Sequence, residues 1–344
     1  MKPWIHQWTT WEYLPASIAN IPIYGFYTWF ALRARHFAFF SNVNPAIPLG
    51  GAAGESKWDI LQLLPESILP KAVFVPAKAP FEQIEALRKT AGLDFPLIAK
   101  PDKGERGFLV QKIADAEALR HHLTRYPVDF ILQEFLSLPL ECSVMYHLHP
   151  RTGHFDLHSV CIKEFLSVTG DGLATVRQLM ATQTRAAFQL ARFEKEKAEL
   201  MDTIPAKGEV LLLEPIGNHA RGTKFINGNY LIDERLKRAF EPICRNIPGV
   251  HFGRFDLKCA SLEALYRGEF KAMELNGVFS DPAHVFDPTY GALRAYRDYY
   301  RQWRLLYELS LEQSQKGIPP TSLGETARII REHLRYKREV ISNK

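Results

Sequence analysis

The sequence predicts an α+β fold whose strands form separate sheets rather than one doubly wound parallel sheet. From residue 76 onward, short apolar runs of strand type alternate with amphipathic helical stretches. Several of these runs follow one another directly and are joined by turn residues, which is typical of antiparallel hairpins. At 344 residues the chain is long enough for two or three domains or subdomains.

Residues 1–75 form a region rich in aromatic side chains that precedes this alternating pattern. Its longest apolar run, residues 18–40, is interrupted by Arg33 and Arg35 and falls short of the roughly 20 apolar residues that a membrane-spanning helix needs. We expect this run to form one or two helices that pack on the rest of the chain or on a second subunit in a homodimer. Because aromatic side chains beside arginines also suit a membrane interface, a peripheral membrane contact through residues 1–40 stays open.

Residues 76–145 are expected to form a small α+β subdomain. Gly92 closes its first helix, and Asp115 is a suitable N-cap for its second. The pattern predicts, in order, a helix at 80–92, strands at 95–101 and 107–113 joined as a hairpin, a helix at 115–126, and a strand at 130–136 that leads into a bend.

Residues 146–310 are expected to form a larger subdomain, followed by a basic helical tail at 311–344. Helical periodicity begins near Leu293 and continues into that tail. The predicted elements are a hairpin of 142–150 with 154–166, helices at 173–183, 188–201 and 234–247, a strand at 209–217, and paired strands at 253–260 and 270–277.

Composition and charge fit a globular protein that handles small anions. Hydrophobic residues make up 46% and charged residues 24% of the chain, close to the averages of globular proteins. The formal net charge of +5 is small and dispersed, so it suits nucleotides but does not indicate nucleic-acid binding. The four cysteines include no C-x-x-C pair, and the chain begins with no signal-peptide pattern. We therefore expect reduced cysteines and a cytoplasmic protein, with membrane association left open.

Two carboxylates and an amide are expected on one face of the last strand pair. Asp256 lies in the strand at 253–260, and Glu274 and Asn276 follow in the strand at 270–277. If these strands are adjacent, Asp256 can face Glu274, and Asn276 lies on the same side because side chains alternate along a strand. All three offer hard oxygen donors of the kind that Mg²⁺ accepts. Two unrelated acids at a sheet edge would show the same spacing.

Lys100 is a candidate for anion binding. It ends a strand that is apolar enough to be buried, where an ammonium group needs an anionic partner. Gly104 and Gly107 flank the turn that follows, and flexible backbone there could close over phosphates. Further on, the bend after residue 136 could present backbone groups to an adenine edge, and Glu141 could bind ribose. A surface lysine before a turn and a solvent-facing glutamate are the plainer alternatives.

The order of these motifs resembles the ATP-grasp superfamily, and D-alanine–D-alanine ligase is the nearest well-known relative in pattern. The resemblance covers roughly residues 80–287, and residues 168–179 are similar to a segment of cyanophycin-synthetase-like and glutathione-synthetase-like members. It implies two α+β subdomains that clasp ATP. Residues 1–75 and 277–288 depart from the ligase pattern, so a dipeptide product is not implied.

The resemblance assigns a role to each motif. Arg254 falls where the ligases keep an arginine on the reacting phosphate and the tetrahedral intermediate. Asp256, Glu274 and Asn276 become ligands of Mg²⁺, or of Mn²⁺ in its place. The nucleotide contacts implied are Lys100, Gly104 and Gly107 at the phosphates, Gln133, Glu134 and Leu136 at adenine, and Glu141 at ribose.

Three further basic segments lie near these motifs in the sequence. Lys163 follows the central hairpin and could reach the ATP phosphates. Arg221 and Lys224 lie among glycines in residues 217–225, which either touch phosphate or substrate or form a basic turn. The glycine-rich loop that ends at Lys57 lacks the Gly-Lys-Ser/Thr ending of a P-loop, so we interpret it only as a candidate substrate or phosphate contact.

The resemblance implies an ATP-dependent ligase that joins a small-molecule carboxylate to a small-molecule amine through an acyl phosphate. The sequence does not identify either substrate. Two alternatives remain at this stage. One is a kinase that uses the same nucleotide site to phosphorylate a hydroxyl group, and the other is a nucleotide-binding membrane-surface protein.

Overall fold

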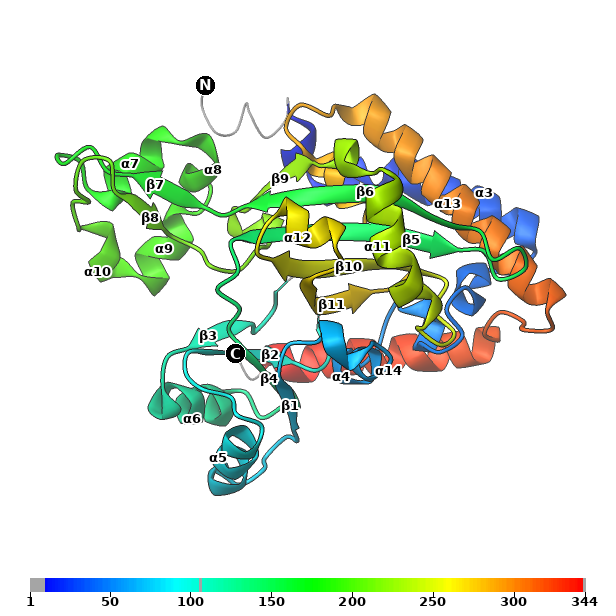
Figure 1. Cartoon of the computed structure of the whole chain (residues 1–344), viewed down its shortest axis with the longest axis horizontal. Coiled ribbons are helices and arrows are strands. Elements are labelled where there is room, and N and C mark those ends of the chain that lie inside the picture. Colours follow the sequence, from blue (N-terminus) through cyan, green and yellow to red (C-terminus); the bar gives the residue numbers. More distant parts are fainter. Residues whose placement is uncertain (1–9, 105–106, 343–344) are drawn as a thin grey trace.

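The computed structural model describes residues 10–104 and 107–342. The strands of these residues form three sheets of four, five and two strands, and every strand pair is antiparallel. Helices cover the two larger sheets instead of alternating with parallel strands (Figure 1). The predicted α+β fold with separate sheets is confirmed. Part of the aromatic region, residues 1–9, and the tip of the glycine-rich turn, residues 105–106, lie outside the described residues.

The small sheet has the strand order β1-β4-β2-β3. Its strands are β1 (Ala72–Val75), β2 (Leu97–Pro101), β3 (Gln111–Ile113) and β4 (Phe130–Glu134). Two helices, α5 (Phe81–Thr90) and α6 (Ala116–Arg125), pack on it and close a buried apolar core with Leu97 and Phe130. As expected, the side chain of Asp115 caps α6 by accepting a hydrogen bond from the Ala118 N–H.

The hairpin of β2 and β3 pairs as predicted, with Leu97 opposite Ile113. Strand β3 is shorter than expected and begins only at Gln111. The reason lies in the backbone before it, where Gly107 and Leu109 both have positive φ angles, of 70° and 54°, that a strand cannot accommodate.

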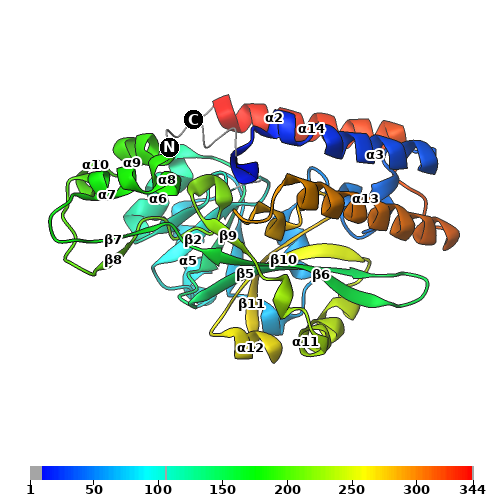
Figure 2. The same ribbon diagram turned by 90° about the horizontal axis from the view of Figure 1, so that it is seen from above.

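The large sheet has the strand order β11-β10-β5-β6-β9. Its strands are β5 (Leu140–Leu148), β6 (Phe155–Glu164), β9 (Lys224–Asn227), β10 (Phe252–Cys259) and β11 (Phe270–Asn276). Two helices, α11 (Glu234–Arg245) and α12 (Leu262–Tyr266), cover one face, where Phe240 packs on Phe255. Figure 2 shows that α3 (Ile21–Ala34) and α13 (Ala292–Gln315) lie on the opposite face. The edge strand β9 was not expected from the sequence.

A two-stranded lobe is inserted in the large sheet between β6 and β9. It consists of β7 (Ser167–Thr169) and β8 (Val210–Leu212) with the short helices α7 (Val176–Thr182), α8 (Thr184–Ala187), α9 (Leu190–Glu196) and α10 (Ala198–Met201). The lobe has its own apolar core and lies at one end of the molecule in Figure 1. A capping box of Thr175 with Gln178 begins α7. The single helix expected at 188–201 is broken at Lys197, whose backbone is not helical.

The two ends of the chain contribute helices to the large sheet and its surroundings. At the N-terminal end, α2 (Ala16–Ala19) precedes α3, and α4 (Lys57–Gln62) follows it; at the C-terminal end, α14 (Leu323–Ser342) follows α13. Helix α3 packs on α13, which agrees with the expectation that the aromatic run packs on the rest of the chain. Short 3₁₀ turns complete the fold: η1 (Trp11–Tyr13), η2 (Phe39–Asn42), η3 (Pro48–Gly50), η4 (Glu66–Ile68), η5 (His219–Arg221), η6 (Asn229–Leu231) and η7 (Ala283–Phe286).

Three of the expected boundaries meet elements of the structure, and the one at residues 145/146 falls inside β5. The strand β1 hydrogen-bonds into the small sheet although it lies before residue 76, and α13 continues past residue 310 to Gln315. The division of the chain into domains stays a prediction. In the part of the chain that the structure describes, no helix combines the length and the apolarity needed to cross a membrane.

Candidate functional site

The two strands at the centre of the site pair as the sequence predicts. In the β10–β11 ladder, Asp256 lies opposite Glu274 and Arg254 lies opposite Asn276. The amide Nδ2 of Asn276 donates a hydrogen bond of 3.1 Å to Oδ2 of Asp256. The register shifts directly after Asp256, which marks a local irregularity of the ladder at this point. Two carboxylates, an arginine and an amide therefore share one small area of the sheet.

Asp256 is held between two cations. Nη2 of Arg254 lies 3.2 Å from its Oδ2, and Nζ of Lys163 on β6 lies 3.4 Å from its Oδ1. Burial alone would raise the pKa of Asp256, but Arg254 and Lys163 lower it to about 2. The carboxylate is thus charged at neutral pH, and its Oδ1 accepts no hydrogen bond.

Glu274 is paired with Lys57, a residue that the sequence offered only as a candidate contact. Oε1 of Glu274 lies 3.0 Å from Nζ of Lys57, and the same ammonium donates to the carbonyl oxygen of Gly104. Burial opposes the charge on Lys57, but Glu274 outweighs it and raises the pKa of this lysine. Asp102 fixes the position of Lys57, because its Oδ1 accepts hydrogen bonds from the Ser56 hydroxyl and the Trp58 N–H at the start of α4.

Glu141 lies between two lysines on neighbouring strands. Its Oε1 accepts a hydrogen bond of 3.0 Å from Lys163, and its Oε2 lies 3.6 Å from Nζ of Lys258 on β10. Lys258 also donates to the carbonyl oxygen of Leu136, at 3.2 Å, in the bend after β4. Sequence reasoning missed Lys258. The signal was present, since Arg254, Asp256 and Lys258 alternate along one strand and so share a face.

Lys100 reaches the same area from the small sheet. Its side chain leaves β2 and donates a hydrogen bond of 2.8 Å to the carbonyl oxygen of Met273 on β11. The residue is only 7% exposed, and among the described residues no carboxylate lies within ion-pair distance of it. Burial lowers the pKa of Lys100 to about 8, against the opposing effect of Glu274. The described residues therefore leave the positive charge of Lys100 without a carboxylate partner.

The expected adenine bend is only partly oriented toward the cluster. Gln133 is buried in β4, whereas the Glu134 side chain accepts a hydrogen bond of 2.8 Å from the Lys71 N–H at the edge of the small sheet. Leu136 faces the cluster through its carbonyl oxygen, which Lys258 binds. The bend and the charged cluster are therefore joined through Lys258 and Glu141.

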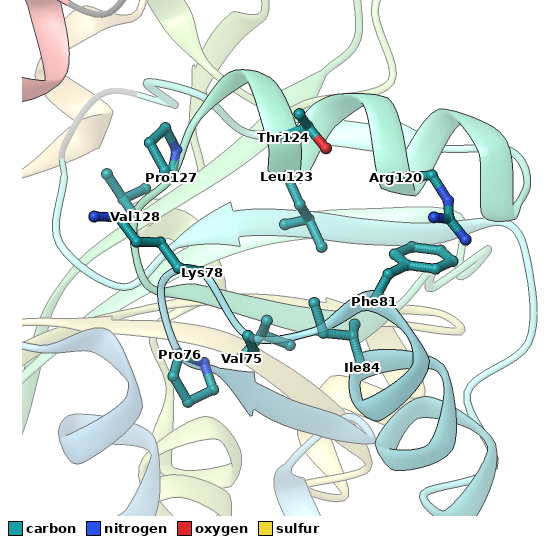
Figure 3. Close-up of a pocket in the computed structure, with 11 residues that line it drawn as sticks. Val75, Pro76, Lys78, Phe81, Ile84, Arg120, Leu123, Thr124, Pro127 and Val128 are labelled. Atoms are coloured by element: carbon teal, nitrogen blue, oxygen red, sulfur yellow. The ribbon is translucent and has the colours of Figure 1, made fainter.

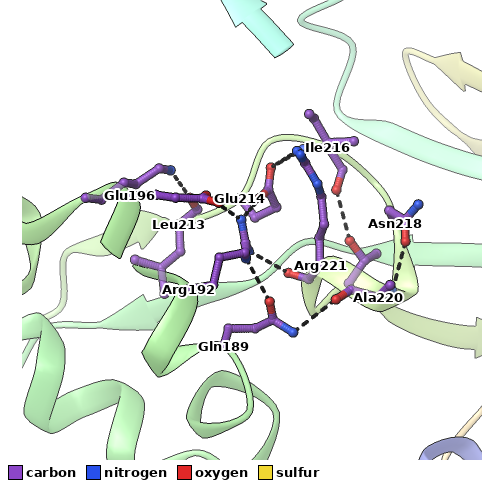
Figure 4. Close-up of polar contacts among 11 residues, drawn as sticks. Gln189, Arg192, Glu196, Leu213, Glu214, Ile216, Asn218, Ala220 and Arg221 are labelled. Carbon is purple, nitrogen blue, oxygen red and sulfur yellow. Dashed lines mark hydrogen bonds and ion pairs between the residues drawn. The ribbon is translucent and has the colours of Figure 1, made fainter. Parts of the chain in front are cut away.

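A network centred on Glu214 holds the basic loop at residues 217–223. Glu214 lies 2.8 Å from Nη1 of Arg192 and 3.5 Å from Nη1 of Arg221, and Arg192 also donates to the carbonyl oxygen of Arg221 (Figure 4). Gln189 in the inserted lobe donates to the carbonyl oxygen of Ala220, at 3.1 Å. The lobe thus anchors this loop. Lys224, by contrast, pairs with Glu164 at the surface, at 3.3 Å.

Close approaches at two glycines show where this loop lies. A Cβ atom added to Gly217 would fall 2.0 Å from Oε1 of Glu141, and one added to Gly107 would fall 3.1 Å from Nδ2 of Asn218. The loop is therefore in contact with the charged cluster on one side and with the glycine-rich turn on the other. Arg221 is near Gly107, because its Nε would lie 3.9 Å from the added Cβ atom, whereas Lys224 pairs with Glu164 at the surface.

A pocket of about 320 Å³ lies elsewhere, between α5 and α6 in the small subdomain (Figure 3). Its lining includes Phe81 and Arg120, and Cζ of Arg120 lies 4.1 Å from the centroid of the Phe81 ring. The lining contains none of the expected site residues. Within residues 10–104 and 107–342, no group of three or more histidines, cysteines, aspartates and glutamates is arranged to hold a metal ion. The central site offers two such carboxylates, and an amide as its third oxygen donor.

No family model matches the chain, and no curated protein matches its sequence. Solved structures similar to the chain include three ligases and synthetases. VanG D-Ala:D-Ser ligase from Enterococcus faecalis is 14% identical, with a TM-score of 0.44 over 76% of this chain and 64% of that chain. D-alanine–D-alanine ligase from Bacillus anthracis is 12% identical, with a TM-score of 0.40 over 76% and 68%.

A bifunctional glutathione synthetase from Pasteurella multocida is 16% identical, with a TM-score of 0.37 over 72% of this chain and 35% of that chain. The chain thus covers less than two thirds of two of these three structures. Similarities this low transfer neither an activity nor a residue role. The chemistry has to follow from the charged cluster itself.

Proposed function

We propose that the chain is an ATP-dependent ligase of the ATP-grasp type, which joins a small-molecule carboxylate to an amine through an acyl phosphate. The observation that carries this proposal is Lys100, a buried ammonium group with no carboxylate partner among the described residues. It lies in a cluster where Lys57, Lys163, Arg254 and Lys258 already share the carboxylates of Glu141, Asp256 and Glu274. A buried cation needs a counter-charge, and a polyphosphate supplies one.

The oxygen donors of the site fit a divalent cation. Oδ1 of Asp256 is buried without a hydrogen bond, Glu274 has a second carboxylate oxygen beyond the one paired with Lys57, and Asn276 adds an amide oxygen. Oxygen donors of this kind suit Mg²⁺ or Mn²⁺ together with phosphate oxygens. When bound, such an ion would neutralise charge on the phosphates.

Arg254 is positioned to hold the transferring group. Its Nη1 and Nη2 are fixed by the carbonyl oxygen of Asp281, at 3.0 Å, and by Asp256, while its buried Nε has no hydrogen-bond partner. We assign to Arg254 and Lys100 the binding of the phosphoryl group as the substrate carboxylate attacks it. Arg254 would then stabilise the oxyanion that forms when the amine adds and phosphate leaves.

We assign the exclusion of water from the acyl phosphate to the glycine-rich turn that Gly104 and Gly107 flank. Lys57 joins Glu274 to the carbonyl oxygen of Gly104, and Gly107 lies against Asn218. These contacts would keep Gly104 and Gly107 next to the cluster, and an acyl phosphate needs protection from water because water hydrolyses it. Glu141 is our proposed ribose contact. Ribose hydroxyls would share the oxygens of Glu141 with Lys163 and Lys258, because each carboxylate oxygen can accept more than one hydrogen bond.

The test is release of ADP and inorganic phosphate from Mg·ATP in the presence of a small-molecule metabolite extract. We expect both products in the wild type, dependence on the extract, and loss of both in Glu274→Gln. The matched control is Glu269→Gln, an exposed glutamate on the turn before β11, which should keep full activity. ADP without phosphate would show a kinase instead, and full activity of Glu274→Gln would refute the assignment of the site.

A further inference from the structure

Helix α3 is apolar on both of its sides. On the inner side, Tyr27 and Phe30 pack on Trp303 and Tyr307 of α13, with ring centroids 5.2 and 5.4 Å apart. The outer side carries four large side chains that are each between 54% and 71% exposed, namely Ile21, Tyr24, Trp29 and Leu32. The helix contains no acidic residue. A helix that is apolar all round is normally covered on both sides, and no described residue covers the outer side of α3 sufficiently to bury these four.

Helix α14 has a similar division of its surface. Its inner side packs on the rest of the chain, where Ile329 meets the loop at Gly54 and the Tyr336 hydroxyl donates to the carbonyl oxygen of Lys103 at 3.2 Å. Its outer side forms a shallow apolar strip bordered by arginines, made of Ala327, Ile330, Leu334, Arg331, Arg335 and Arg338.

The two helices lie on the same side of the molecule. In Figure 2 both run along one edge, on the side of the large sheet that is opposite α11 and α12. Figure 1 shows them separated by the segment that leads from η2 to α4. We call the outer sides of these two helices the α3–α14 face. It consists of two segments, one from each end of the chain, that lie on the same side of the molecule.

The α3–α14 face carries positive charge that the protein leaves unneutralised. Among the described residues, no carboxylate lies within ion-pair distance of four exposed arginines, Arg33, Arg35, Arg331 and Arg338. Arg33 instead lies over the ring of Trp29, 5.9 Å from its centroid. Nε of Arg335 lies 2.9 Å from Oε1 of Glu339 on its own helix. Exposed apolar side chains and unpaired arginines thus occur together on this face.

We propose that the α3–α14 face docks on a membrane surface that contains anionic lipid. Tryptophan and tyrosine favour the boundary between headgroups and acyl chains, and arginines beside them are attracted to anionic headgroups. A two-fold contact with a second copy fits less well. It would bring the unpaired arginines of both copies together. Helix α3 has no carboxylate to meet them, and the glutamates of α14 are already paired with arginines of their own helix, namely Glu325 and Glu332 with Arg328 and Glu339 with Arg335.

The experiment is co-sedimentation of the full chain with phosphatidylcholine vesicles, with and without phosphatidylglycerol. We expect sedimentation with the anionic vesicles only, and a loss of binding in the double variant Trp29→Ser with Leu32→Ser. The matched control is Leu173→Ser, which removes a still more exposed leucine from the inserted lobe (83% exposed, against 71% for Leu32) and should bind as the wild type does. Reversing two charges, in Arg331→Glu with Arg338→Glu, should weaken binding about tenfold or more.

Sedimentation needs neither ATP nor turnover, so its result is independent of the ligase assay. Vesicle binding that survives the α3 double variant would overturn the proposal, as would the absence of binding to anionic vesicles. A wild-type dimer in sedimentation equilibrium that the same double variant dissociates, without vesicle binding, would show that a second copy covers this face and would also overturn it. Unchanged circular dichroism of each variant shows that the exposed substitutions left the fold intact.

Discussion

Positively charged side chains are concentrated in two regions of the molecule, which differ in whether these side chains are buried and whether they are paired with carboxylates. In the central cluster, Lys57, Lys163, Arg254 and Lys258 are enclosed by the protein and lie between 3.0 and 3.6 Å from carboxylates. On the α3–α14 face, four arginines are exposed and have no carboxylate within ion-pair distance among the described residues. Burial of a charge is costly unless it is paired, while an exposed charge is stabilised by water.

The difference bears on what each region can bind. Paired cations in fixed positions surround Lys100, which has no carboxylate partner among the described residues. This arrangement suits a small anion of defined geometry, because little reorganisation is needed when the anion binds. Exposed arginines on long side chains suit a broad and diffuse partner, for which position matters less than total charge. The two proposals therefore rest on separate groups of residues, and variants in one region should leave the other unaffected.

The largest effect on stability is expected at Glu141. Among the residues that the structure describes, Glu141 is the only carboxylate paired with Lys258 and one of two paired with Lys163. The substitution Glu141→Gln removes it, and both ammonium groups stay buried. Loss of one partner of a buried ion pair leaves an uncompensated charge, so we expect a loss of about 3 kcal/mol in the free energy of unfolding. Urea denaturation followed by circular dichroism measures it.

The control for Glu141 is Glu269→Gln, because Glu269 pairs with Arg267 at 2.7 Å but at the surface. Exposed pairs contribute little, so this variant should unfold at nearly the same urea concentration as the wild type. Equal midpoints for the two variants would mean that Glu141 does not balance the buried lysines.

A smaller effect is expected from pH, and only in the central cluster. Burial lowers the pKa of Lys100 to about 8 in the folded chain, so its ammonium loses the proton as pH rises through that value. ATP binding should then weaken by up to about tenfold for each further pH unit, and it should be coupled to proton uptake. Calorimetric titrations in buffers of different ionisation enthalpy measure both quantities.

The sign for stability is opposite to the sign for ATP binding. Between pH 8 and the ordinary lysine pKa of 10.5, the unfolded chain holds more protons at residue 100 than the folded chain does. The penalty of burying this ammonium is therefore relieved as pH rises through that range. Lys100→Arg, which stays charged, should remove the pH dependence of ATP binding.

Vesicle binding by the arginines of the α3–α14 face should not change over the same pH range. A parallel decline of ATP binding and vesicle binding would argue against the proposal that separate groups of residues carry them.

The two regions also differ in how far the sequence could predict them. Strand alternation predicted that Asp256, Glu274 and Asn276 share one face of the sheet. Residues two positions apart in a strand point to the same face, and residues directly opposite in a strand pair do so as well. Helix α4 gave no such signal for Lys57. This lysine pairs with Glu274 where the start of the helix is hydrogen-bonded to Asp102, a residue far along the chain. The α3–α14 face depends on the packing of both chain ends on the large sheet. No local pattern contains that information.

The smallest effect is expected at Gly25, and its sign should be the reverse of the others. Gly25 lies in the middle of α3, and a Cβ atom added there would meet nothing within 4 Å. Alanine loses less backbone entropy than glycine on folding into a helix, so Gly25→Ala should raise the free energy of unfolding by about 0.5–1 kcal/mol.

The matched variant in the central cluster is Gly217→Ala, whose Cβ would fall 2.0 Å from Oε1 of Glu141. It should destabilise the fold and weaken ATP binding, whereas Gly25→Ala should leave ATP binding unchanged. Urea denaturation and calorimetry on the pair test both statements, and destabilisation by Gly25→Ala would mean that a layer of protein already covers the outer side of α3.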